Sequence, residues 1–139
     1  MSKILPFDRT GRAHLGAPAT TTSSAFTRGD YEDAALAAGL TDYAWSDEHL
    51  CMVETAGYSA DSPLAGAVYV WDPSEDDGDA QRLSVKLKFK TVHWPAAVEV
   101  HIPTSSRECF TERYDGDPDR ATRHAIFRAA IALGRALRG

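Results

Sequence analysis

The predicted fold rests on one stretch of the chain, Arg82-Leu83-Ser84-Val85-Lys86-Leu87-Lys88-Phe89-Lys90. Apolar and polar residues alternate along it without a break, which is the pattern of a β-strand with one buried face. The apolar set would face the core. The cations of the stretch, Arg82, Lys86, Lys88 and Lys90, would lie along the solvent face. We therefore predict a half-buried strand over residues 82–90.

The alternation resumes after a short loop at residues 93–96, so the two stretches together predict a β-hairpin. In the register that suits both faces, Phe89 lies opposite Val100 in the core and Lys90 lies opposite Glu99 outside. A slip of one residue would place half of the apolar set in solvent. The hydrophobic pattern therefore favours this pairing over its neighbours.

Weaker signals place the elements before the hairpin. A short helix is predicted over residues 30–40, with Asp30 as its N-cap. Residues 46–58 fit either a capped helix or a strand, and we favour the strand. Residues 64–71 predict a further strand, and the acidic loop 72–81 would connect it to the lysine-bearing strand as an antiparallel neighbour.

The clearest helix lies at the end of the chain. Asp117 is a suitable N-cap and Pro118 suits the first helical position, and the pattern runs to about Leu137. Phe127 and Ile131 fall at the edge of a stripe of arginines, which suggests that the stripe contributes to a contact surface. An alanine-rich side would allow close packing on the sheet or against a second helix. The predicted apolar side consists of Ile126, Ala130, Leu133 and Leu137.

These elements predict an α+β fold. An antiparallel meander of three to four strands would pack against the long C-terminal helix and the short N-terminal helix. Residues 1–26 have scattered apolar residues without a period and are predicted to form an N-terminal arm, which could be mobile. Residues 27–139 are predicted to form a single domain, a usual size for one hydrophobic core.

The charge balance excludes some classes of partner. The chain has 139 residues and a formal net charge of -5, which argues against a general nucleic-acid or anionic-membrane binder. The positive charge is concentrated near the end, where residues 118–139 contain five arginines and one aspartate. No apolar run suits a signal peptide or a membrane span, so we expect a cytoplasmic protein.

No catalytic or metal-binding motif stands out. Cys51 is expected to be a small core residue, and Cys109 is expected in a polar loop beside Arg107. The acidic loop lacks the ligand spacing of an EF-hand, and the spacing of the His and Cys residues does not suit zinc. We therefore expect a non-enzyme without cofactor or metal. A small enzyme that uses Cys109 or the acidic loop is the third interpretation.

The favoured function is protein binding. Trp94 and Pro95 are placed at the hairpin tip, where an aromatic residue can fold back or anchor a partner. We expect a small non-catalytic protein that binds another protein or assembly, as an inhibitor or accessory factor of the kind that phages and mobile elements encode. A homodimer is the expected oligomeric state. The residues expected to bind the partner are Lys86, Lys88, Lys90, Trp94, Arg120, Arg128 and Arg135.

The second interpretation is an RNA- or DNA-binding module that uses the lysine-bearing strand and the C-terminal arginines. The predicted order of helix, three strands and helix is similar to that of double-stranded RNA-binding domains. However, Asp117-Pro118-Asp119 stands where those domains carry a lysine cluster, and these carboxylates would repel phosphate. The sequence therefore favours a protein partner over a nucleic acid.

Overall fold

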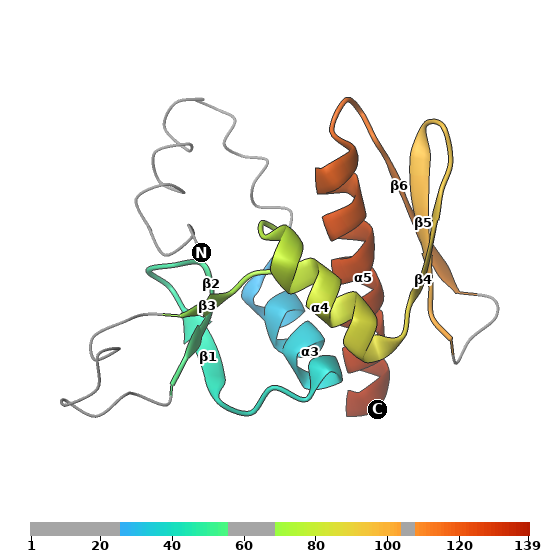
Figure 1. The fold of residues 1–139 in the computed structure, drawn as a ribbon. Helices are drawn as coiled ribbons and strands as arrows, with labels where there is room; N and C mark the ends of the chain where they lie inside the picture. Colours follow the sequence, from blue (N-terminus) through green and yellow to red (C-terminus); the bar gives the residue numbers. More distant parts are fainter. Residues whose placement is uncertain (1–25, 56–68, 104–107) are drawn as a thin grey trace. The chain divides into compact units, whose positions relative to one another are not determined.

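The structure is a computed structural model. It describes residues 26–55, 69–103 and 108–139. Within these ranges the chain has three α-helices and two three-stranded antiparallel sheets (Figure 1). This confirms the predicted α+β class and the long C-terminal helix. Residues 1–25 of the predicted arm lie outside the described residues.

The chain divides into two compact units. The first contains residues up to Glu32 together with Asp42–Trp71, and the second contains Asp33–Thr41 together with Asp72–Gly139. Helix α3 (Arg28–Ala38) contributes to both units. Each unit has one sheet, so the predicted single meander is replaced by two separate sheets in the described part of the chain.

The first unit is built around the sheet β1-β2-β3. Its strands are β1 (Tyr43–Ser46), β2 (Cys51–Glu54) and β3 (Val70–Trp71). The strand interpretation of residues 46–58 is therefore confirmed for the β2 residues. Cys51 is buried, as expected. The rings of Tyr31 and Trp45 pack with their centroids 5.4 Å apart.

The strand predicted over residues 64–71 pairs differently from the prediction. Its described end, β3, pairs with β2 and not with residues 82–90, and residues 64–68 lie outside the described ranges. The predicted acidic loop is also only partly correct. Residues from Asp72 to Asp76 form a turn, and the acids that follow begin a helix.

The N-terminus of α3 corrects a detail of the predicted helix. Thr27, and not Asp30, lies at the cap position. The amide of Asp30 donates to Oγ1 of Thr27, and the amide of Thr27 donates to Oδ2 of Asp30 at 2.9 Å. This reciprocal pair satisfies two otherwise free amide groups. The helix ends before Gly39, whose φ of +73° is readily adopted by glycine.

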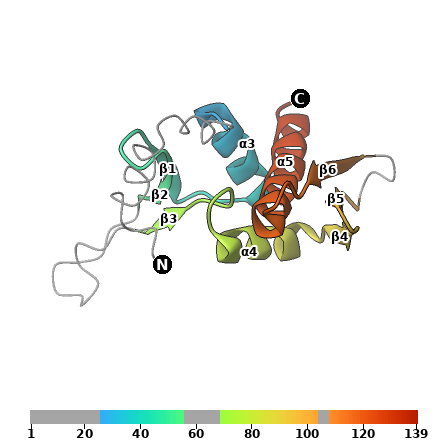
Figure 2. The same cartoon turned by 90° about the horizontal axis from the view of Figure 1, so that it is seen from above.

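The second unit is built around helix α5, which is one of its own elements (Figure 2). This helix packs on strands β5 and β6 and against helix α4. The strands form the sheet β4-β5-β6, in which each neighbour is antiparallel. The elements of this unit are α4 (Asp77–Leu87), β4 (Lys90–His93), β5 (Ala97–His101), β6 (Cys109–Arg113) and α5 (Pro118–Arg138).

The strand predicted over residues 82–90 is wrong, because most of this stretch belongs to α4. The same segment also has a helical period, since Ala80, Leu83 and Leu87 fall on one side of a helix. Asp76 caps this helix, and its carboxylate accepts a hydrogen bond from the amide of Gly78 at 2.8 Å. The cap and the acidic first turn stabilise the helix, and the strand-like alternation does not outweigh them.

The hairpin that follows is confirmed, but its register differs by two residues. Lys90 pairs with His101 and Val92 pairs with Glu99, where Lys90 had been expected opposite Glu99. A shift of two residues leaves every side chain on its predicted face. The turn is shorter than predicted, because the amide of Trp94 already donates to the carbonyl of Ala97 at 2.8 Å.

Helix α5 begins as predicted, with Asp117 as its cap and Pro118 in the first turn. Its packing is broader than the single apolar side that was expected. Phe127 is fully buried and Ile131 is 5% exposed, so neither belongs to a contact surface for a partner. Leu137, expected in the core, is 64% exposed. The helix is enclosed on several sides because the sheet and α4 both pack against it.

Candidate functional site

The two faces of the β4-β5-β6 sheet have different environments. The face toward α5 is the core of the second unit, where Val98 and Val100 are fully buried and Ile102 is 2% exposed. Residues that lie directly opposite each other in antiparallel strands share a face. The alternation along β5 therefore places Glu99 and His101, both half-buried, on the other face.

We call this second face the outer face. Its side chains are mixed in character, and most are exposed or half-buried. In the described part of the second unit, α5 is the only helix in extensive contact with the sheet, and it lies on the opposite side (Figure 1). The outer face consists of Lys90, Val92, Trp94, Ala97, Glu99, His101, Cys109, Thr111 and Arg113.

Trp94 lies at one end of the outer face. The residue is 53% exposed, so the tryptophan does not fold back fully onto the core. The turn that presents it contains only Pro95 and Ala96, since the amide of Trp94 closes the turn onto Ala97. Proline restricts the backbone of this turn, so the turn would lose less conformational entropy when a partner binds it.

The C-terminal arginines predicted to bind a partner are mostly engaged within the chain. Arg135 donates from Nε to Oδ2 of Asp33 at 3.1 Å, and Arg138 donates to the other oxygen of the same carboxylate. Asp33 is 8% exposed. This shared carboxylate ties the end of α5 to the part of α3 that belongs to the same unit.

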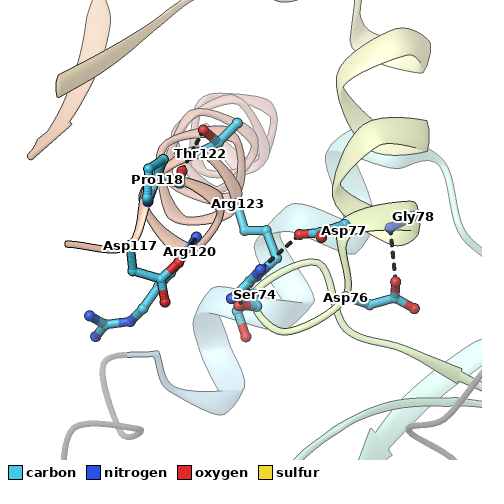
Figure 3. A network of polar contacts seen from close by, with 9 residues as sticks. All are labelled: Ser74, Asp76, Asp77, Gly78, Asp117, Pro118, Arg120, Thr122 and Arg123. Atoms are coloured by element: carbon cyan, nitrogen blue, oxygen red, sulfur yellow. Dashed lines mark hydrogen bonds and ion pairs between the residues drawn. The ribbon is translucent and has the colours of Figure 1, made fainter. Parts of the chain in front are cut away.

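Two further arginines of α5 connect it to other elements of the unit. Arg128 pairs with Glu112 of β6. Arg123 donates to the carbonyl oxygen of Ser74 at 3.1 Å and to Oδ1 of Asp77 at 2.7 Å, at the start of α4 (Figure 3). Arg120 is exposed and has no ion pair among the described residues. The predicted arginine stripe is thus largely a set of internal contacts.

The lysines behave differently. Lys86 lies in the last turn of α4, Lys88 caps that helix in the left-handed conformation and Lys90 is the first residue of β4. All three are exposed. None makes an ion pair within residues 26–55, 69–103 and 108–139. The strand that was predicted to align them is absent, but the chain still gathers them around the junction of α4 and β4.

His124 is a buried titratable residue that was not among the candidate site residues predicted from the sequence. It is 9% exposed on α5. Burial lowers its pKa from 6.5 to about 4, and the nearby positive charges of Arg120, Arg128 and Arg123 act in the same direction, partly opposed by Asp117. The imidazole is therefore neutral at physiological pH. Its low pKa could have been anticipated from the arginines at neighbouring helical positions, but its burial could not.

Cys109 is exposed at the start of β6 and not in the loop where it was expected. It pairs across the strands with His101, whose Nε2 atom lies 3.2 Å from Oε1 of Glu99. Residues 104–107, which include the expected neighbour Arg107, lie outside the described residues. The three side chains share the outer face, but no hydrogen bond joins Cys109 to the imidazole in the described part of the chain.

The acidic segment before and within α4 is an internal network. Asp72 is fully buried, and its carboxylate accepts a hydrogen bond from Oγ of Ser74 at 2.7 Å. Asp79 accepts from the amide of Asp72 and pairs with Arg82 at 2.7 Å. These carboxylates hold the turn against the first turn of α4. Among the described residues, no group of three or more His, Cys, Asp or Glu side chains is arranged to hold a metal ion.

Comparison with known proteins identifies no relative. No protein-family model matches the chain, and neither the curated proteins nor the solved structures contain a significant match. None of the helices in the described residues has the length and apolar character needed to cross a bilayer.

Proposed function

We propose that this chain is a non-catalytic protein-binding protein whose contact surface is the outer face, with Trp94 as its anchor. The observation that carries the proposal is the 53% exposure of this tryptophan on a tight turn. Tryptophan is one of the commonest energetic hot spots in protein interfaces. An exposed indole on a restricted turn loses little conformational entropy when it is buried by a partner.

The composition of the surface around Trp94 supports a protein partner. Val92 and Ala97 extend the apolar contact, and Thr111 and Arg113 add polar groups on the same face. Protein interfaces combine an aromatic or apolar centre with a polar rim in this way. Four of the five α5 arginines are held by Asp33, Glu112 and Asp77, which makes the sheet the better candidate for the contact.

The test is a capture experiment from native lysate with the wild-type chain, Trp94→Ala and Leu50→Ala as baits. Leu50 is a matched control, because it is an apolar side chain with 55% exposure in the other unit. We expect Trp94→Ala to weaken binding of the captured protein by about 2 kcal/mol or more, and Leu50→Ala to have little effect. Equal binding by all three baits would contradict the proposal.

Nucleic-acid binding is the second candidate, and the observation in its favour is the group of exposed lysines at the α4–β4 junction, which form no ion pair with any described residue. Nuclease treatment of the lysate separates the two candidates, because a protein held through nucleic acid would be released. Binding to nucleic acid would also weaken steeply with salt as counterions are displaced. We expect capture to survive nuclease. In the same experiment Cys109→Ser tests the enzyme interpretation, and we expect it to bind as the wild type does.

A further inference from the structure

Strand β4 is an edge of its sheet, and its hydrogen-bonding pattern can be deduced. Trp94 donates to the carbonyl of Ala97, so these two residues form a hydrogen-bonded pair. Such pairs alternate with non-bonded ones along an antiparallel ladder. The backbone groups of Val92 therefore point toward β5, and those of Thr91 and His93 point away from it. Their amide and carbonyl groups form an open edge in the described part of the unit.

The two ends of this edge have different chemistry. Lys86, Lys88 and Lys90 lie where the edge begins, and Trp94 lies where it ends. The distance from Lys90 to Trp94 along an extended strand is about 13 Å, at roughly 3.3 Å per residue. A strand added to this edge would thus have positive charge beside one end and an exposed indole beside the other.

The opposite edge of the same sheet lacks this combination. Among the described residues, strand β6 also has no pairing strand on one side, but its charged residues are balanced locally. Glu112 pairs with Arg128, and Arg113 lies 3.9 Å from Asp115. Its aromatic residue, Phe110, is half-buried on the face toward α5. The positive charge and the exposed aromatic side chain are both found at the β4 edge.

We propose that the β4 edge binds an extended, acidic segment of a protein partner, which adds to the sheet as a further strand. The inference rests on the proposed function and specifies how the partner is held. The backbone groups of Thr91 and His93 would supply main-chain hydrogen bonds, which are the basis of affinity in strand addition. Acidic side chains of the segment would meet the lysines, and an apolar side chain would cover Trp94.

The complementary charge also explains which strands the edge rejects. Lysines on an edge strand, such as Lys90, or close to its start, such as Lys86 and Lys88, discourage pairing between copies of the same chain, because like charges would be brought together. The same lysines favour a strand that carries carboxylates. The charge thus selects the partner, and the open backbone and Trp94 supply the contacts.

The main test replaces Thr91 by proline. This substitution removes the amide that points to the open edge and leaves the β4–β5 ladder intact, because proline is tolerated where its missing N–H faces solvent. Thr111→Pro is the matched control. The hydrogen bond from the amide of Tyr114 to the carbonyl of Ala96 sets the β5–β6 pattern, so Thr111 also directs its amide away from the sheet, but at the opposite edge.

A displayed library of random peptides provides the probe. Selection on the wild-type chain should enrich peptides that carry acidic residues and an aromatic or aliphatic residue toward one end. Synthetic copies of the enriched peptides should bind Thr91→Pro at least about tenfold more weakly, and Thr111→Pro within about twofold of the wild type. Enriched peptides without acidic residues, or equal loss in both proline variants, would overturn the proposal.

A second variant keeps the test decisive if Thr91→Pro does not fold. Replacing Lys86, Lys88 and Lys90 together by Ser should weaken the enriched peptides by about tenfold at low salt and by less at high salt, because the contact is charge-assisted. Unchanged peptide binding would refute the acidic partner. Tighter binding of a single-stranded oligonucleotide than of any peptide would assign the edge to nucleic acid. A dimer in gel filtration that Thr91→Pro abolishes would assign the edge to a second copy of the chain.

The same variants separate this inference from the proposed function. If lysate capture is lost in Trp94→Ala but survives in Thr91→Pro and in the lysine variant, the outer face binds a protein without strand addition, and only the inference fails. If capture is independent of Trp94, the proposed function fails. Loss of capture in Trp94→Ala and Thr91→Pro, with retention in Thr111→Pro, supports both.

Discussion

The arginines of α5 and the lysines at the α4–β4 junction have the same charge but different roles. Arg123, Arg128, Arg135 and Arg138 all contact carboxylates of other elements. The lysines are exposed and make no ion pair among the described residues. Cationic residues on a surface therefore do not by themselves identify a binding site. The difference depends on whether a carboxylate from another element lies within reach.

The largest effect is expected where α5 crosses the part of α3 that belongs to its unit. A Cβ atom at Gly134 would lie 1.7 Å from the carbonyl oxygen of Asp33. Gly134→Ala would therefore force the helices apart and disturb the ion pairs of Arg135 and Arg138. We expect a loss of about 3 kcal/mol or more in the free energy of unfolding, measured by denaturant titration.

Gly78→Ala is the matched control for this substitution. A Cβ atom there would lie 3.2 Å from the end of the flexible Arg82 side chain, which can move. Because alanine is a better helix former than glycine, stability should change by less than about 1 kcal/mol and in the favourable direction. If Gly134→Ala changed stability as little as Gly78→Ala does, the two helices could not approach as closely at Gly134 as the structure shows.

The second effect concerns His124, whose pKa is influenced by the positive charges of Arg120, Arg128 and Arg123. Its pKa is lowered from 6.5 to about 4, so the folded state binds fewer protons than the unfolded state between these values. The contribution of the neutral imidazole is complete above about pH 6.5 and is lost as the pH falls toward 4. At about 1.4 kcal/mol per pKa unit, the loss reaches up to about 3 kcal/mol.

Denaturant titrations at several pH values, with His124→Gln for comparison, measure this contribution. The carboxylates titrate in both proteins, so the difference between the two curves isolates the histidine. We expect the wild type to lose stability faster than the variant below pH 6.5. Parallel curves would show that His124 is not desolvated.

A smaller effect is expected for the carboxylate shared by two arginines. The Asp33 side chain is 11% exposed, whereas those of Arg135 and Arg138 are 62% and 53% exposed. Asp33→Asn should cost about 1 to 2 kcal/mol, because the exposed guanidinium groups can still be hydrated. Asp115→Asn, whose carboxylate is 74% exposed beside Arg113, should change stability by less than about 0.5 kcal/mol.

The smallest effect is expected for the lysines. Lys86→Ser and Lys90→Ser should each change the free energy of unfolding by less than about 0.5 kcal/mol, as is usual for exposed side chains. Lys88 has a φ of 58°, so Lys88→Gly should be neutral or stabilise the chain by up to about 1 kcal/mol. A large loss in any of these variants would place the lysines with the arginines, as structural residues.

Local patterns in the sequence were sufficient for several elements. The cap at Asp117 and the proline after it predicted where α5 begins, and the alternation from Val98 to Ile102 predicted the buried side of β5. Capping and alternation patterns depend on residues that are close together in the sequence, so they can be recognised without the tertiary structure. Among the candidate binding residues, Trp94 and the lysines are exposed, whereas Arg128 and Arg135 are engaged by Glu112 and Asp33.

The stretch from Arg82 to Lys90 illustrates why a local pattern can mislead. Its apolar residues fit both a period of two and a helical period, and the N-cap at Asp76 favours the helix. As a result Val85, which the strand pattern would bury, is 66% exposed. The hairpin register was also two residues off, because both registers keep the same residues on the same face.

The sequence by itself determined the α+β class, the C-terminal helix, the hairpin and the place of Trp94 at its turn, because caps, turns and periodicity act over a few residues. Only the tertiary structure decided which cationic side chains pair with a carboxylate and which edge strand has no pairing strand beside it among the described residues. Asp33 lies about a hundred residues from Arg135 in the chain, and no local pattern reports such a contact. The pairing of charges depends on the packing of α5, and that packing follows from the burial of side chains across the whole unit.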